Sequence, residues 1–373
     1  MQKRIATAAV LAAAVFVTAP RSSTSVPQVQ ALPAQQVAAE IMLPPVMETE
    51  KPATLAVLDR DGRLVPLVSL KLPEGRQITT DSTGRARFVV SAAPGPYTVE
   101  CVNSTAGTVV QATSTVIAHP SVPDGVSSTE LVVASISRFV ATTGHIVVHG
   151  SGFRGDADVN HVTFAARPAL VLASSPESLV FQPGPAAVPG RSTAVIEIAG
   201  HSSKPLDVTL VAVDILRPAK GLVVGKKAAL TVTITGTVER VPLAVENLFP
   251  GNIALTNGNF QRLMSGGGQP NTASIQFRSV HEGDFSVSVR VMSAVPDANT
   301  FASARRELIA ASGVAKGDWA RAVDRLVNRF DDTHANGHDA ERLQGDIEKI
   351  LNENPPAELQ KQLRAAWLDF VRD

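Results

Sequence analysis

The chain is poor in cysteine, in aromatic residues and in net charge. Cys101 is the only cysteine among 373 residues, so a disulfide framework, a cysteine-ligated zinc and a CxxC redox centre are excluded within one chain. Tyr97 is the only tyrosine, and Trp319 and Trp367 are the only tryptophans. The 34 basic residues are balanced by 34 acidic ones, which argues against a nucleic-acid binder that depends on a basic excess.

The rest of the composition is typical of a folded protein. Hydrophobic residues make up 44% and charged residues 18% of the chain, so most of it can bury a core. At roughly 100–200 residues per domain, the length leaves room for about two to four domains.

The N-terminus has the pattern of a secretory signal peptide. Lys3 and Arg4 precede an apolar stretch from Ile5 to Ala19, and this order is typical of export signals. Small residues favour cleavage after Ala31, and no cysteine directly follows the stretch to accept a lipid. An uncleaved anchor is the alternative, but the stretch is shorter than the ~20 residues that span a bilayer. We expect residues 1–31 to be removed and the mature chain to be secreted or periplasmic, without a membrane span.

The next segments predict a linker and a first β unit. Four prolines in residues 32–52 predict an extended, Pro-rich linker. Residues 53–118 alternate short strands with turns of the type Asp…Gly, in which the glycine can take a positive φ. The turn sequence TTDSTGRARF, followed by the strand PGPYTVEC, resembles the carboxypeptidase regulatory-like (transthyretin-like) family. The resemblance implies a small β-sandwich.

Residues 131–213 carry a second pattern of strands. Alternation places Ile146 on one face of a strand, and Gly150 and Gly152 allow a bend that delivers Phe153 into a core shared with Ile146 and Phe164. The order GHIVVHGSGF…VNHVTF resembles the IPT/TIG family of immunoglobulin-like sandwiches, although VATTG stands where the family usually has a proline and paired glycines. The resemblance implies a spacer, adhesion module or contact surface and no particular ligand.

The remaining sequence predicts a third β unit and a helical unit. Residues 214–295 contain several short strands separated by glycines, which favours another sandwich, of no family that we can name. The expected strands are Leu222–Val224, Ala229–Ile234, Val241–Val245, Ser274–Phe277 and Phe285–Val291. From residue 300 to 373 the apolar period becomes helical, and three or four helices are expected, one of them starting at Asn354-Pro355.

The search for reactive chemistry found only weak candidates. Asp59 and Asp61 flank a turn that could seed a calcium site, but turn chemistry explains them better because the distal acidic ligands are missing. The segment Asp331–Asp339 contains His334 and His338 and could take Zn²⁺ or Ni²⁺, yet a polar interhelical loop is the favoured reading.

Other motifs fail on spacing or context. Gly221–Lys227 has the wrong spacing for a phosphate loop, Gly266–Gly268 precedes no helix, and the remaining histidines are scattered. Cys101 is expected to be a buried hydrophobe. We therefore predict no catalytic, cofactor-binding or metal-binding residues and no cofactor.

The sequence as a whole predicts a mainly β protein: tandem Ig-like β-sandwich domains with a small C-terminal α-helical bundle. We expect an exported, non-enzymatic binding, adhesion or scaffold protein whose partner is a protein or glycan at the cell surface or in the periplasm. The alternative is an accessory carbohydrate-binding protein for extracellular polysaccharide, although the β units offer few aromatic rings for sugars. The apolar stripes of the helices either close on themselves or leave one face open for a partner or a second copy.

Overall fold

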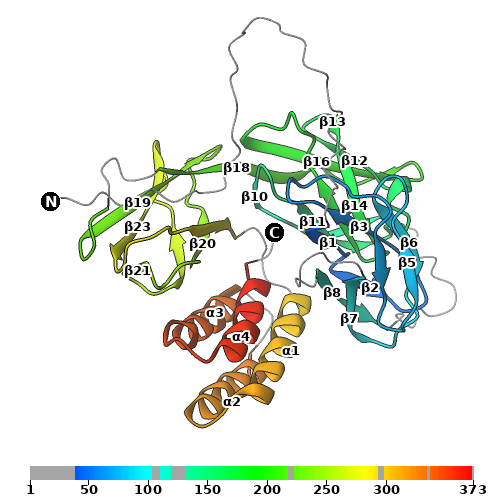
Figure 1. Cartoon of the computed structure of the whole chain (residues 1–373). Coiled ribbons are helices and arrows are strands. Elements are labelled where there is room, and N and C mark those ends of the chain that lie inside the picture. Colours follow the sequence, from blue (N-terminus) through cyan, green and yellow to red (C-terminus); the bar gives the residue numbers. More distant parts are fainter. Residues whose placement is uncertain are drawn as a thin grey trace, which may run out of the picture.

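The computed structural model describes residues 38–102, 110–118, 131–216, 222–292, 298–333 and 337–371. Strands dominate up to residue 291, and four helices follow at the C-terminal end (Figure 1). This arrangement confirms the predicted fold class. Among these residues, no helix has the length and apolarity that crossing a bilayer requires.

The N-terminal unit is a sandwich of two sheets. One is a five-stranded sheet of order β2-β8-β7-β4-β5, and the other belongs to a larger seven-stranded sheet through β1, β3 and β6. Phe88 of one sheet stacks on Tyr97 of the other, with ring centroids 5.9 Å apart. The strands are β1 (Glu40–Met42), β2 (Val46–Glu48), β3 (Pro52–Leu58), β4 (Ser69–Lys71), β5 (Gln77–Thr79), β6 (Arg85–Val89), β7 (Gly95–Cys101) and β8 (Gln111–Ile117).

The expected linker is wrong over its described part, residues 38–52. This segment contains β1 and β2, and Met47 is fully buried in the core of the unit. Pro44 and Pro45 separate the two strands, and the carbonyl oxygen of Pro44 accepts a hydrogen bond from the Ser114 hydroxyl at 2.6 Å. Prolines between strands remove donors but leave acceptors, so they are compatible with sheet structure at strand ends.

The second unit is the sandwich expected over residues 131–213. Ile146, Phe153 and Phe164 lie in one buried cluster, as predicted. A Cβ at Gly150 would lie 2.0 Å from the Val132 carbonyl oxygen and Gly152 has a φ of +85°, so the bend requires both glycines. The strands are β9 (Val132–Ile136), β10 (Phe139–Ala141), β11 (Ile146–Ser151), β12 (His161–Phe164), β13 (Arg167–Pro168), β14 (Leu170–Ser174), β15 (Ser178–Gln182), β16 (Gly190–Ile198), β17 (His201–Ser202) and β18 (Leu206–Leu216).

The first two units share the seven-stranded sheet. Thr54 of β3 is paired with Ser174 of β14, and the Thr54 hydroxyl donates to the Gly155 carbonyl oxygen at 2.6 Å. The Ser178 hydroxyl donates to the Val46 carbonyl oxygen at 2.9 Å. Arg85 forms an ion pair with Asp158 at 2.6 Å. Sheet pairing, hydroxyl bonds and charge together hold these units in one orientation.

The third unit continues from the second along one strand. The first half of β18 pairs with β16 and its second half pairs with β19, so β18 belongs to both units. The outer sheet of the third unit contains β18, β19, β23 and β21, and a three-stranded sheet of order β22-β20-β24 packs against it. The strands are β19 (Lys227–Thr235), β20 (Pro242–Asn247), β21 (Ile253–Leu255), β22 (Phe260–Met264), β23 (Asn271–Ser279) and β24 (Val287–Val291).

Two local predictions need correction. Leu222–Val224 forms no strand but a loop, in which Val223 is 61% exposed. The last helix begins at Ala357 instead of Asn354-Pro355. Pro355 is itself followed by Pro356, and a residue before proline is disfavoured in the helical region. The helices are α1 (Ala298–Val314), α2 (Asp318–Asp331), α3 (Gly337–Asn352) and α4 (Ala357–Asp369).

Candidate binding surface

The two Asp…Gly turns are structural. The Asp59 carboxylate accepts hydrogen bonds from the backbone N–H groups of Asp61 and Arg63, at 2.8 and 2.9 Å. The Asp81 carboxylate accepts in the same way and also from the Thr83 hydroxyl, which holds the pKa of Asp81 below its ordinary value. The Asp59 and Asp81 carboxylates thus satisfy the backbone of their own turns, whereas the Asp61 carboxylate pairs with Arg63 at 3.6 Å.

The histidine-rich segment Asp331–Asp339 lies only partly within the described residues, because residues 334–336 fall outside them. Asp331 pairs with Arg305 at 2.6 Å, and Asp339 pairs with Arg342 at 3.3 Å. In the part of the chain that the structure describes, no three His, Cys, Asp or Glu side chains are grouped as metal ligands.

The other reactive candidates lie far apart. His145 is half-buried just before β11, and burial lowers its pKa while the charge of Glu40 opposes this shift. Cys101 is buried in the N-terminal core, as predicted. Lys226 and Lys227 follow a turn with Gly225 at a φ of +81°, and Gly266–Gly268 leads into strand β23. No phosphate-binding helix terminus follows either loop among the described residues.

The aromatic residues form cores instead of a sugar platform. Tyr97 is fully buried, and its hydroxyl donates to Glu74 at 3.2 Å; burial raises its pKa. Trp367 is 1% exposed and Trp319 is half-buried. Phe249, at 44%, is the one largely exposed aromatic side chain among the residues that the structure describes.

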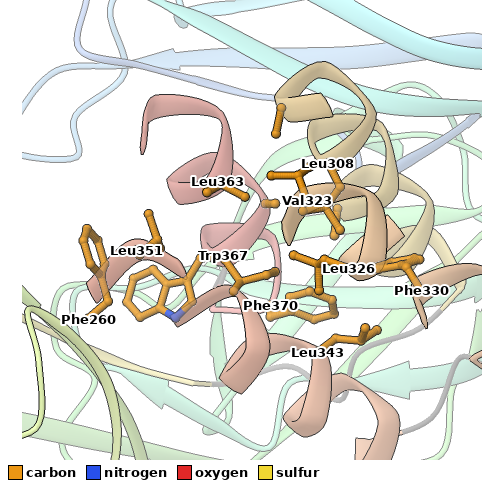
Figure 2. Close-up of a cluster of buried hydrophobic side chains, with 14 of the residues drawn as sticks. Phe260, Leu308, Val323, Leu326, Phe330, Leu343, Leu351, Leu363, Trp367 and Phe370 are labelled. Atoms are coloured by element: carbon orange, nitrogen blue, oxygen red, sulfur yellow. The ribbon is translucent and has the colours of Figure 1, made fainter. Parts of the chain in front are cut away.

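The helical unit closes partly on itself and partly on the third β unit. Its four helices share an apolar cluster that also includes Ala244 of β20 and Phe260 of β22 (Figure 2). Trp367 meets Phe260 edge to face at 5.5 Å, and its indole N–H donates to Glu348 at 2.9 Å. The expected alternatives, a self-contained bundle or a face open to a partner, are thus replaced by docking within the chain.

Polar contacts give this docking a defined geometry. Arg364 donates two hydrogen bonds to Glu246, at 2.5 and 2.9 Å, and Glu246 is 6% exposed. The Asn352 side chain donates to the Phe260 carbonyl oxygen and accepts from the Phe260 N–H, both at 2.9 Å. A Cβ at Gly258 would lie 2.4 Å from the Asn352 side chain, so this close approach needs glycine.

One face of the sheet of the third unit presents exposed side chains on three neighbouring strands. We call it the outer face. Strand alternation buries Leu230, Val232 and Ile234 and turns the residues between them outward. Register places Thr231 opposite Ser274 and Lys227 opposite Arg278. The outer face comprises Asp214 and Leu216 of β18, Lys227, Ala229, Thr231, Thr233 and Thr235 of β19, and Thr272, Ser274, Gln276 and Arg278 of β23.

The outer face was missed by the sequence reasoning, although part of its signal is visible there. The run Thr231-Val-Thr-Ile-Thr235 alternates hydroxyl and apolar residues, which predicts a strand with one hydroxyl-bearing face. The register of β19 against β23 places Ser274 and Gln276 on the same face as these threonines. A single sequence does not reveal this register.

Three solved structures are among those that this chain matches. SGBP-B of the Bacteroides ovatus mixed-linkage glucan utilization locus, in complex with a mixed-linkage heptasaccharide, is 12% identical, with 70% of this chain and 63% of that one covered at a TM-score of 0.18. The BSP domain of a biofilm associated protein is 16% identical, with 47% and 29% covered at 0.24. The four N-terminal Ig domains of Dscam1 are 13% identical, with 67% and 74% covered at 0.22. At such scores we draw no functional conclusion, and the chain spans less than two thirds of the first two.

The comparison of sequences is more specific. A search of curated proteins gave no match. The family model described as IPT/TIG domain matches residues 131–210, from just before β9 into β18. This part of the chain is an IPT/TIG domain.

Proposed function

We propose that the chain is an exported, non-enzymatic modular protein that acts as a binding, adhesion or scaffold protein at the cell surface or in the periplasm. The observation that carries the proposal is the continuity of its sheets. β3 joins the first unit to the IPT/TIG domain, and β18 joins that domain to the third unit. A frame of this kind holds binding faces at fixed distances from one another.

The titratable groups support a non-enzymatic role. Tyr97, His145, Glu177 and Glu348 have pKa values shifted chiefly by burial. They lie on separate elements, and His145 and Glu177 flank opposite ends of β11. Catalytic sites instead bring shifted groups together in one cleft.

The proposed division of the chain follows the units. Residues 1–31 form a signal peptide, 53–118 a carboxypeptidase regulatory-like sandwich, 131–213 the IPT/TIG unit, 214–295 a third sandwich and 300–373 a helical domain. Tyr97 in the core of the first unit supports its assignment, because the related families place the tyrosine of the PGPYTVEC strand there.

Export and binding are tested on the full precursor expressed in its host. N-terminal sequencing of protein recovered outside the cytoplasm should find a new terminus near residue 32; material that begins at Met1 contradicts export. The mature chain, immobilised, should saturably capture a protein or polysaccharide from the host cell surface. Chemical turnover of the captured material would contradict a non-enzymatic role.

The contribution of the helices is better tested by point variants than by truncation. Deleting residues 300–373 would uncover Phe260 and leave Glu246 unpaired, so lost capture would have two explanations. The variants Arg325→Ala and Lys361→Ala lie on exposed helix positions and leave the docking contacts intact.

The second candidate function, an accessory carbohydrate-binding protein, is favoured by the hydroxyl-bearing outer face. A glycan array probed with the mature chain discriminates it from a protein-binding scaffold.

A further inference from the structure

We infer that the outer face binds an acidic polysaccharide in which neutral sugars separate the uronic acid units. The inference rests on the proposed binding function and names the ligand class and the surface that takes it.

One end of the outer face carries an uncompensated positive charge. Lys227 and Arg278 are directly opposite each other on neighbouring strands, both exposed, and Lys226 precedes them. Like charges in this position repel each other and destabilise the sheet. None of the three forms an ion pair with an acidic side chain in the described parts of the chain. A carboxylate bound between them would remove the repulsion and gain charge-assisted hydrogen bonds.

The outward side chains next to this basic end are hydroxyl and amide groups. Thr231, Ser274 and Gln276 are exposed, and the Gln276 amide already donates to the Ser274 hydroxyl at 2.7 Å. Hydroxyl and amide groups both donate and accept, which suits the hydroxyl groups of sugars. Side chains on one face of a strand repeat about every 7 Å, and neighbouring strands lie about 4.8 Å apart. A flat array with this spacing suits an extended chain and not a small molecule in a pocket.

An acidic residue at the other end of the outer face limits how much negative charge the ligand can carry. Asp214 lies opposite Thr233, six residues or about 20 Å along the strand from Lys227. A densely charged polyanion running along the face would meet this carboxylate. A chain in which neutral sugars separate the carboxylates can place one carboxylate between Lys227 and Arg278 and a neutral sugar near Asp214.

An aromatic ring is available at the basic end. Phe249 is exposed in the loop that leads into β21, whose Ala254 is paired with Arg278. The loop is fixed by hydrogen bonds, because the Phe249 carbonyl oxygen accepts from the N–H groups of Asn252 and Ile253 at 3.0 and 3.2 Å. A ring held in this way can stack on the apolar side of a sugar.

The test is calorimetric titration of the full mature chain with an octasaccharide of alternating glucuronate and N-acetylglucosamine. The matched ligand is the same octasaccharide with its carboxylates reduced to alcohols. We expect the acidic form to bind and the reduced form to bind roughly tenfold or more weakly, since hydrogen bonds to charged groups contribute about 1.5–3 kcal/mol.

The matched variants carry the same change of charge. Lys227→Ala/Arg278→Ala should lose roughly tenfold or more in affinity, whereas Arg191→Ala/Lys204→Ala, which removes two exposed cations from the IPT/TIG unit, should bind like the wild type. Phe249→Ala should weaken binding of both octasaccharides. Thermal melts of all three variants confirm folding, and the removal of two exposed, mutually repelling side chains leaves the core intact.

Three results would overturn the inference: no binding of the acidic octasaccharide, equal binding by Lys227→Ala/Arg278→Ala, or competition by inorganic sulfate at the same concentration as the sugar. Each would leave the proposed binding function standing if the mature chain still captures material from the host surface. Loss of that capture, with the octasaccharide still bound, would instead contradict the proposed function and keep the inference.

Discussion

Two of the joints between units are held in contrasting ways. The first unit meets the IPT/TIG domain through sheet pairing and hydroxyl groups, with Thr54, Ser175 and Ser178 donating to backbone carbonyl oxygens. The helices meet the third unit through apolar packing of Trp367 on Phe260, reinforced by the ion pair between Arg364 and Glu246. The first joint depends on backbone approach and the second on side-chain volume, so different substitutions should break each.

The largest effect is expected at the apolar joint. Trp367→Ala removes a buried ring from the cluster shared by all four helices and should destabilise the helical unit by about 3–5 kcal/mol. The midpoint of denaturant unfolding, followed by circular dichroism at 222 nm, measures the loss. Trp319→Ala, at a half-buried position, serves as the control and should lower the free energy of unfolding by clearly less than Trp367→Ala. Equal costs would show that Trp367 does not anchor the joint.

The sheet joint should be broken by a single methyl group. A Cβ at Gly155 would lie 1.9 Å from the Pro52 carbonyl oxygen, which belongs to the neighbouring unit. Gly155→Ala should therefore destabilise the joint by about 1–3 kcal/mol through overpacking. Gly184→Ala, whose Cβ would meet its nearest atom at 3.7 Å, is the control within the IPT/TIG unit. Equal thermal melts for the two variants would contradict the close approach.

Breaking the buried ion pair of the helical joint should cost more stability than breaking an exposed ion pair between two helices. Arg364→Ala leaves the buried carboxylate of Glu246 without its partner and should cost about 1–3 kcal/mol. Arg305→Ala breaks an exposed pair with Asp331 and should cost about 0–1 kcal/mol. Denaturant unfolding of both variants tests the difference, and a larger cost for Arg305→Ala would refute it.

The smallest expected effect depends on pH. Burial raises the pKa of Glu348, although the hydrogen bond from Trp367 opposes the shift. The folded state thus binds the proton more tightly than the unfolded state, so stability is lost as the pH rises through the raised pKa. Glu348→Gln should raise the melting temperature at pH 7 and leave it nearly unchanged near pH 3, where the carboxyl is protonated in both states of the wild type. Glu353→Gln, at an exposed position directly after α3, should change neither.

Much of the architecture was predictable because it depends on local periodicity. The strands around Gly150 and Gly152 and the helices from residue 298 onward were expected from alternation and helical spacing, and they are present. The prolines at positions 44 and 45 predict a linker, but in the structure they only separate β1 from β2. The strand expected at Leu222–Val224 failed because an apolar run also fits a loop whose valines stay exposed.

The candidate surface was harder to predict than the fold. Lys227 and Arg278 are 51 positions apart in sequence, and only the register of β19 against β23 sets them side by side. In the same way, the helical spacing of apolar residues predicts that Trp367 lies on an apolar face. It does not predict that Phe260, on a strand of another unit, packs against Trp367. Pairings between distant segments depend on the whole packed chain and leave no local signal.

By itself the amino-acid sequence determined the class of each unit, because period-2 and period-3.6 patterns depend only on residues near one another along the chain. It also determined that cysteine chemistry is limited to one buried thiol. Only the tertiary structure decided that the units share sheets, that the helices dock on the third unit and that two cations meet on its outer face. These features arise from contacts between residues far apart in the sequence, which form where burial and register satisfy several segments at once.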